Sequence, residues 1–287
     1  MSSPAGLFQI VTFARDLARG NPAFVLTDPG EASEPSMSDL CDTLGAGVLA
    51  VVDGVADPEP GLRFFTPDGP HPGAGHSTLA AAHVVLRRSP GRGAVTFRIG
   101  NGEARIARTT GDRIAIGYPI IPATHSERVD VIGAALGARL SECLVSSFGY
   151  IAILSDAEAV AGLRPDLAEV AALGRSAVIA TAPGGPDCDI VIRVFAPNAG
   201  LPEDPVCGTA HRIIIPYWSE RLGLRSLHSR HLSRRGGDLW CEAAGEEVTI
   251  AGESRLVVEG TADLAGACSS EVDPAHVNKM PPLEEES

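Results

Sequence analysis

The chain has 287 residues, enough for one large domain or for two domains of roughly 100–150 residues each. Its hydrophobic content of 44% supplies a sizeable core, and its formal net charge is −13. Because the arginines are scattered and Lys279 is the only lysine, neither a nucleic acid nor an anionic membrane is expected as a partner.

Six irregularly spaced cysteines form no C-x-x-C pair. The first residues lack the basic flank and long apolar core of a signal peptide, and no apolar run approaches the ~18 residues that span a bilayer. We therefore expect reduced, mostly buried thiols in a cytoplasmic protein.

The first half of the chain predicts strands interrupted by two helices. Strands are expected at 7–13, 23–26, 48–52, 62–67, 95–99, 102–108 and 113–117. A short helix is expected at 38–44, capped by Ser36 or Ser38. The second helix, LAAAHVVLRR, follows Gly75-His76-Ser77-Thr78, and its small and apolar residues predict burial nearly all round.

The second half begins at a proline-bounded segment, 119–122, which predicts a lobe boundary. Helices are expected at 129–136, 156–163 and 165–173, and strands at 143–145, 149–154, 177–181, 190–195, 232–244, 247–251 and 255–259. An apolar helix follows Gly208-Thr209, with Thr209 as a possible N-cap, and Pro216 predicts a kink or a late helix start. The tail, 266–287, is expected to be partly disordered.

Both halves of the chain share one order of motifs. RFFTP (63–67) precedes a loop, GHST (75–78) and an apolar helix, whereas RVFAP (193–197) precedes a loop, GTAH (208–211) and an apolar helix. Unless these short motifs coincide by chance, the repeat predicts an α+β fold of two pseudo-symmetric lobes, 1–118 and 119–265, each a bent sheet around a central helix. A cleft between the lobes would let both helix N-termini face one small anion.

The strings GNPAFVL (20–26), RFFTP (63–67), AGHSTLAAAHVV (74–85), RVFAP (193–197) and PEDPVCGTAH (202–211) resemble the PhzF-like isomerases of the diaminopimelate epimerase-like superfamily. The resemblance implies two β-barrel-like lobes around central helices, an active site between the lobes, and neither a metal nor an organic cofactor. A homodimer is also expected.

The sequence departs from the family's pattern at its acids. Val48 stands where the resemblance places the acid/base glutamate, and Pro70 replaces the glutamate of the E-x-P-x-A-G-H string. Related epimerases and racemases use one cysteine at each central helix, and the matching positions are Ala74 and Cys207. A two-thiol racemase is therefore not expected. A closer likeness is to the PhzF-like isomerases of 4-alkyl-proline antibiotic pathways of the lincomycin type, which implies a double-bond shift in a pyrroline carboxylate.

Three residues are predicted to be catalytic. Asp204 would accept a proton or hold the substrate nitrogen, His76 would relay protons, and Cys207 would be a thiol whose pKa the helix dipole lowers. Gly75, Ser77, Gly208 and Thr209 are predicted to bind the substrate by supplying amides and hydroxyls to its carboxylate or to a developing enolate. Asn21 is also predicted to bind the substrate, because it matches a substrate-contacting position in the superfamily that the chain resembles.

Each candidate has a structural alternative. Acids favour helix starts, so Asp204 and Glu203 are also candidate caps, and Asn21 is also a turn residue. Structural roles are favoured for His83 and His211. A surface position is favoured over metal binding for His228 and His231, because no third ligand stands out.

The sequence thus predicts a cofactor-independent isomerase of a small cyclic unsaturated amino acid in antibiotic biosynthesis. Two alternatives stay open. One is a Cys207-dependent epimerase or dehydratase of a proline-like acid. The other is a non-catalytic ligand-binding family member that lost catalysis along with the glutamate.

Overall fold

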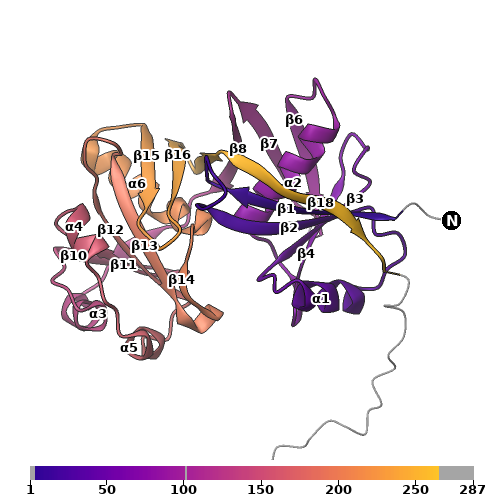
Figure 1. The fold of residues 1–287 in the computed structure, drawn as a ribbon. Coiled ribbons are helices and arrows are strands. Elements are labelled where there is room, and N and C mark those ends of the chain that lie inside the picture. The colour runs from indigo at the N-terminus through magenta and orange to yellow at the C-terminus, as the bar shows by residue number, and fades with distance from the viewer. Residues whose placement is uncertain (1–3, 101, 265–287) are drawn as a thin grey trace, which may run out of the picture.

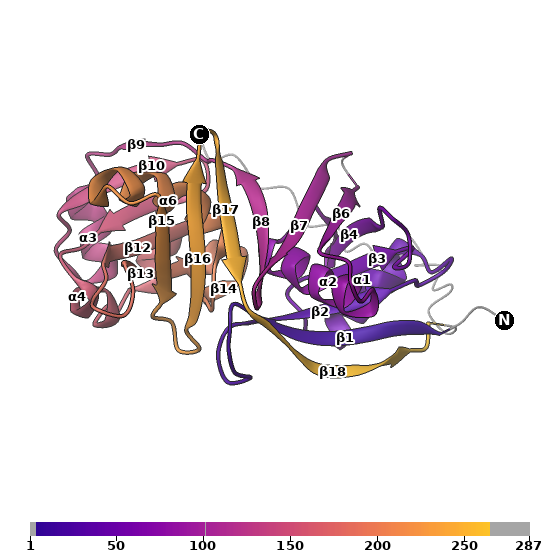
Figure 2. The ribbon, with the colours of Figure 1, turned by 90° about the horizontal axis from the view of Figure 1, so that it is seen from above.

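The computed structural model describes residues 4–100 and 102–264, and the predicted tail at 266–287 lies outside them. Two lobes lie side by side, each formed by strands that curve around one central helix (Figures 1 and 2). The central helices are α2 (Gly75–Arg88) and α6 (Gly208–Leu222). All strands join into one hydrogen-bonded sheet that continues from lobe to lobe.

The first lobe contains the strands of the N-terminal half and the last described strand. These are β1 (Ala5–Thr12), β2 (Asn21–Thr27), β3 (Leu49–Asp53), β4 (Gly61–Thr66), β5 (Gly69–His71), β6 (Ala94–Ile99), β7 (Ala104–Thr110), β8 (Arg113–Pro119) and β18 (Ser254–Ala262), with helix α1 (Glu34–Thr43).

The second lobe contains the remaining elements. Its strands are β9 (Ala123–His125), β10 (Glu142–Ser146), β11 (Gly149–Ile153), β12 (Ala177–Pro183), β13 (Ile190–Ala196), β14 (Leu201–Asp204), β15 (Ser226–His231), β16 (Gly237–Ala244) and β17 (Glu247–Gly252). Its outer helices are α3 (Val129–Leu136), α4 (Ala157–Ala161), α5 (Leu167–Ala172) and the 3₁₀ turn η1 (Pro197–Ala199).

Strand pairing confirms the internal repeat. In the first lobe, β1 to β4 pair antiparallel, parallel and antiparallel in turn, β4 pairs parallel with β6, and β6 to β8 continue antiparallel. The second lobe follows the same pattern. Strands β10 to β13 pair antiparallel, parallel and antiparallel in turn, β13 pairs parallel with β15, and β15 to β17 continue antiparallel. Each central helix occupies the same place in its lobe, before the strand that pairs parallel. The predicted α+β fold of two similar lobes is therefore confirmed.

Two strand pairings tie the lobes together. β8 pairs antiparallel with β17 from Ile114↔Gly252 to Pro119↔Glu247. β18 then crosses back and pairs with β1 along its whole length (Figure 2). The lobe boundary predicted at residue 118 assigns residues 254–262 to the second lobe. In the structure, this strand is hydrogen-bonded to the first lobe, because it pairs with the edge of β1 that β2 leaves open.

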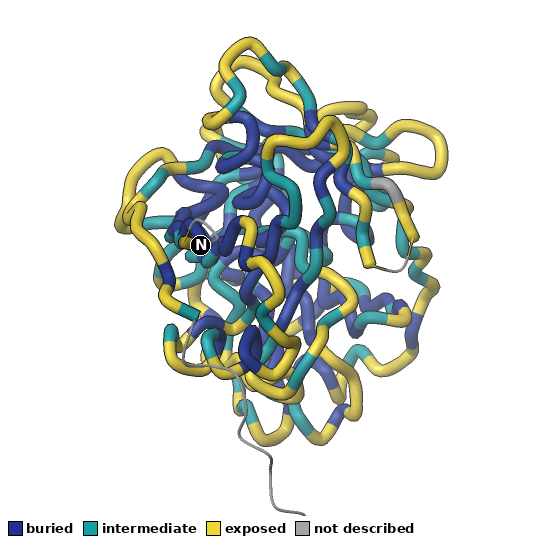
Figure 3. Tube along the Cα trace, turned by 90° about the vertical axis from the view of Figure 1, so that its right-hand side faces the viewer, coloured by how far each residue is buried: buried dark blue, intermediate teal, exposed yellow. Residues whose placement is uncertain are grey.

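Small residues allow α2 to lie inside its sheet. Nine of its residues from Ser77 to Leu86 are buried, as the sequence predicts, with alanines at 80–82 where strands approach closely. Residues of α2 and α6 belong to one core cluster that spans both lobes. Figure 3 shows buried positions gathered inside the fold and exposed positions in the peripheral loops. Among the described residues, no helix is both long and apolar enough to cross a membrane.

Helix α6 accommodates an internal proline, and the late start predicted from Pro216 is wrong. The helix begins at Gly208 with Cys207 as its N-cap, so Thr209 is not the cap. A proline has no N–H to donate to the carbonyl four residues earlier. That carbonyl, of Arg212, accepts instead from the Ile121 amide at 3.1 Å. The Arg212 carbonyl, which Pro216 leaves without a helical partner, therefore binds the segment that connects the lobes.

Two further element predictions are corrected. Helix α1 starts at Glu34, four residues before the predicted start, because Ser33 caps the Ser36 amide and Pro35 suits the first turn. The predicted strand at 232–244 begins only at Gly237, and a separate strand, β15, precedes it at Ser226–His231.

Candidate active site

A cavity of about 330 Å³ lies between the N-termini of the two central helices. Gly75 lines it from α2, and Gly208 and Thr209 line it from α6. The first amides of a helix have no partner within the helix and carry its positive dipole end. Two such ends therefore face one cavity, which suits a small anion. Gly75, Gly208 and Thr209 are thus where the sequence analysis expects the ligand.

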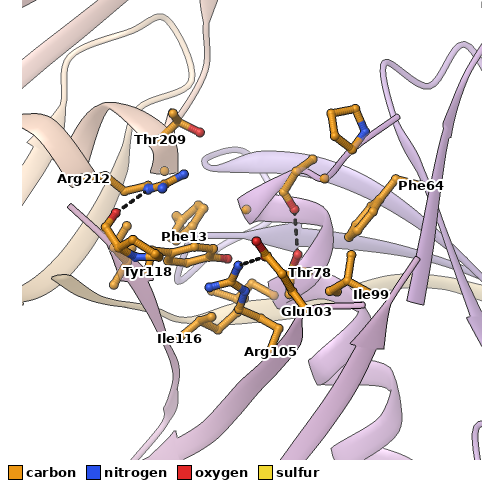
Figure 4. Close-up of a pocket in the computed structure, with 18 residues that line it drawn as sticks. Phe13, Phe64, Thr78, Ile99, Glu103, Arg105, Ile116, Tyr118, Thr209 and Arg212 are labelled. Carbon is orange, nitrogen blue, oxygen red and sulfur yellow. Dashed lines mark hydrogen bonds and ion pairs between the residues drawn. The ribbon is translucent and has the colours of Figure 1, made fainter. Parts of the chain in front are cut away.

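The part of the cavity wall beside the helix starts is charged and was not predicted. Arg105 on β7, Tyr118 on β8 and Arg212 on α6 meet there, and Figure 4 shows the tyrosine between the two arginines. The guanidinium carbons of Arg105 and Arg212 lie 4.8 Å and 5.7 Å from the centroid of the Tyr118 ring. Glu103, next to them, accepts from Arg105 at 2.7 Å. These residues are far apart in sequence, and only the strand pairing brings them together.

The first turn of α2 holds two predicted residues that do not line this cavity. His76 is partly buried, and burial, followed by the nearby His71, lowers its pKa to about 4, so its imidazole is neutral at physiological pH. Ser77 is fully buried, and its hydroxyl has no hydrogen-bond partner among the described residues. The Ser77 side chain is therefore not at the cavity surface, although its amide belongs to the same helix start.

Asp204 is held at the entrance to α6 by a residue from the other lobe. Its Oδ1 accepts from Asn21 Nδ2 at 3.2 Å and from the Val206 amide at 3.0 Å. Asn21 is buried and also donates to the Val206 carbonyl at 3.0 Å. Burial raises the pKa of Asp204, although the Cys207 thiol and the Val206 amide lower it. The acid is thus positioned as a base stronger than an ordinary aspartate.

Two buried histidines hold the backbone of Cys207. His231 Nε2 accepts from the Cys207 amide at 3.2 Å, and His211 Nδ1 donates to the Cys207 carbonyl at 2.8 Å. Since a carbonyl only accepts, the proton of neutral His211 is on Nδ1, and Nε2 accepts from the Ser229 hydroxyl at 2.8 Å. Burial lowers the pKa of His211 to about 4 and that of His231 well below the ordinary value. His211 is structural, as favoured, whereas the surface interpretation of His231 is wrong.

The Cys207 thiol itself is buried. Burial, followed by the charge of Asp204, raises its pKa well above the ordinary value. The predicted lowering by the helix dipole is therefore wrong, because desolvation outweighs it. The thiol stays protonated and can donate a proton, but it is a poor nucleophile.

Other candidates have structural partners. Glu203 forms a two-bond ion pair with Arg193, at 2.6 Å and 3.2 Å. His83 contacts the Ser254 hydroxyl of β18 at 2.7 Å, and His228 contacts Asp238 at 2.8 Å. Val48 lies just before β3 and packs against the main core cluster, so the chain offers no acid there.

Phe13 closes the floor of the cavity in a strained conformation. Its φ of 59° is in the left-handed region, which is costly for an aromatic residue. A Cβ at Gly252 or at Gly237 would collide with Phe13 atoms, so both positions are free of side chains where β16 and β17 pass it. The strained residue is therefore one that lines the cavity, and the glycines of β16 and β17 leave room for it.

Comparisons with known proteins identify the family of the chain. Residues 10–262 match the PhzC-PhzF family, described as phenazine biosynthesis-like protein. The chain belongs to this family. Two uncharacterized isomerases of Pseudomonas aeruginosa are similar to it. One is 40% identical over 71% of this chain and 78% of its own length, and the other is 33% identical over 90% and 98%. The expectation of an isomerase agrees with both names.

Solved structures confirm the predicted fold. A phenazine biosynthesis protein of the PhzF family from Enterococcus faecalis has a TM-score of 0.86 at 30% identity, covering 91% of this chain and 100% of its own. A hydroxyproline epimerase from Agrobacterium vitis has a TM-score of 0.53 at 12% identity, covering 89% and 91%. The latter likeness shows the epimerase-like fold alone.

Proposed function

We propose that this PhzF-family chain is a cofactor-independent isomerase that moves a proton, and with it a double bond, in a small cyclic unsaturated amino acid, such as a pyrroline carboxylate. The observation that carries the proposal is the cavity that Gly75, Gly208 and Thr209 line between the two helix starts, with Asp204, which does not itself line the cavity, held at the end of β14 in the segment that leads into α6. The cytoplasmic location, the homodimer and the role in antibiotic biosynthesis belong to the same proposal.

The chemistry follows from the charges at the site. The amides of the two helix starts bind the substrate carboxylate and stabilise the negative charge that spreads onto it when a neighbouring C–H bond breaks. Asp204 takes that proton, because burial raises its pKa and makes it a stronger base. The electron pair shifts along the conjugated system, and a proton returns at its far carbon.

The returning proton has two sources at the site. Protonated Asp204 can deliver it again, or the buried Cys207 thiol can donate it, since its raised pKa keeps it protonated. Neutral His76, in the first turn of α2, is the candidate relay from the other lobe. Val48 supplies no second carboxylate, so Asp204 is the carboxylate on which this mechanism depends.

Deuterium exchange tests this function. The protein is incubated with pyrroline dienes in D₂O, and the ultraviolet spectrum and deuterium uptake are followed. We expect the double variant Asp204→Asn/His76→Ala to lose activity by at least about 100-fold. The matched control Asp130→Asn/His125→Ala changes an exposed acid and an exposed histidine, and should keep it. Full activity in the Asp204→Asn/His76→Ala variant would contradict the roles proposed for Asp204 and His76.

A cysteine variant separates this function from a thiol-dependent epimerase. The raised pKa of Cys207 opposes a thiolate base, so Cys207→Ser should change the isomerisation rate by less than about tenfold. A loss of activity comparable to that of the Asp204 variant would show that the thiol carries the reaction.

A further inference from the structure

The cavity has a second cationic region besides the helix starts. Its charged lining residues are Glu103, Arg105 and Arg212, which together carry a net charge of +1. Arg105 and Tyr118 belong to β7 and β8, and Arg212 lies one turn after the start of α6. A ligand group bound here would contact guanidinium and hydroxyl donors rather than the helix-start amides.

The backbone and the Nε atom of Arg212 are held by hydrogen bonds. Its two terminal guanidinium nitrogens are left to bind a ligand. Its carbonyl accepts from Ile121, and its Nε donates to the Pro119 carbonyl at 2.8 Å. Within residues 4–100 and 102–264, neither terminal nitrogen donates a hydrogen bond. Two parallel N–H donors on a side chain already held in place match the two oxygens of a carboxylate.

Arg105 brings a second positive charge close to the first. It donates to the Gly117 carbonyl at 3.1 Å and to the mostly exposed Glu103. Burial, followed by repulsion from Arg105, lowers the pKa of Arg212. A bound anion would relieve this repulsion, because each guanidinium would then face a negative group.

The Tyr118 hydroxyl completes the region. Its oxygen is buried beside Thr78, and the ring lines the cavity between the two arginines. A Cβ on Gly75 would lie 3.6 Å from this oxygen, so the hydroxyl adjoins the start of α2. A ligand carboxylate at this point can accept from the hydroxyl, and hydrogen bonds to charged groups are stronger than those between neutral groups.

We propose that the substrate carries a second carboxylate, which Arg212 binds together with Arg105 and Tyr118, while the first carboxylate lies between the starts of α2 and α6. The net charge of +1 in this region matches a singly charged carboxylate better than a doubly charged phosphate. The inference rests on the proposed function and narrows its substrate class to cyclic unsaturated diacids. Arg212 is then the residue that determines specificity for the diacid.

Calorimetry with two acids of one ring size tests the proposal. The probes are pyrrole-2-carboxylate and pyrrole-2,4-dicarboxylate. Wild-type protein should bind the diacid at least about tenfold more tightly. Arg212→Gln should lose this preference and keep its affinity for the monoacid. The control Arg221→Gln removes an exposed arginine from the same helix and should keep the preference.

Arg105→Gln provides a second route if Arg212→Gln fails to fold, since it alters the region from the other lobe and should also reduce the preference. The proposal is overturned if wild-type protein binds the two acids within about threefold, if it binds neither, or if Arg212→Gln weakens both equally. The deuterium assay is independent of these results. A preserved diacid preference without exchange on any substrate would overturn the proposed isomerase and leave the second carboxylate site standing.

Discussion

Replacing His211 by asparagine should change the pH dependence of folding stability. His211 is fully buried, with Nδ1 donating to the Cys207 carbonyl and Nε2 accepting from the Ser229 hydroxyl. The asparagine amide can keep the bond to the carbonyl, but it leaves the serine hydroxyl without its partner. At pH 7 we therefore expect a loss of about 1–3 kcal/mol in the free energy of unfolding.

The stability difference between wild type and His211→Asn should shrink in acid. The pKa of His211 is about 4 in the folded protein and 6.5 ordinarily, so the folded state binds fewer protons between these values. Stability from the neutral imidazole is present above pH 6.5 and is lost as the pH falls to about 4. At 1.36 kcal/mol for each pKa unit, this loss amounts to about 3 kcal/mol. The variant has no such group at position 211, so its deficit at pH 7 should vanish by pH 4.

Urea unfolding of both proteins at pH 7, 5.5 and 4 measures this difference. All other titrating groups are common to the two proteins and largely cancel. His125→Asn, which changes an exposed histidine, should run parallel to wild type. A stability difference between wild type and His211→Asn that is the same at every pH would refute the buried neutral histidine.

Two further predictions concern the acid and the tyrosine of the site. Because burial raises the pKa of Asp204, its stabilising contribution is greatest below its ordinary pKa and is lost as the pH rises through the folded value, so Asp204→Asn should raise the melting temperature at pH 7. An unchanged or lower melting temperature would contradict this. Tyr118→Phe removes a buried hydroxyl that lies beside Thr78, so the ligand-free protein should lose no more than about 1 kcal/mol of stability in urea, whereas diacid affinity in calorimetry should fall. Unchanged diacid affinity would contradict a contact between this hydroxyl and the ligand.

The central helix starts could be predicted from the sequence, but the charged wall of the cavity could not. Gly75 and Gly208 each follow a strand and a loop in the same repeated order of motifs. This local pattern is enough to expect a helix start at each glycine. Arg105, Tyr118 and Arg212 have no such local pattern, because β7, β8 and α6 meet only through the fold.

Burial also changes what a local pattern means. A thiol at a helix start suggests a lowered pKa, yet enclosure raised the pKa of Cys207. Similarly, His228 and His231 read as a surface pair, but the alternation of β15 leaves one partly exposed and buries the other beneath the N-cap of α6. The exposed fraction of each side chain depends on strands that are distant in sequence.

Because Pro216 leaves its carbonyl without a helical partner, Arg212 joins α6 to the segment that connects the lobes. Its carbonyl and its Nε hold Ile121 and Pro119, so two bonds fasten the connecting segment to the residue whose fork faces the cavity. Rotation of one lobe about that segment would break these bonds and also peel β8 from β17. These bonds oppose such a rotation, and a site held in place before the ligand arrives loses less entropy on binding. Selectivity then depends on the fixed spacing between the helix starts and the Arg212 guanidinium. Diacids whose two carboxylates are separated by that distance should bind best.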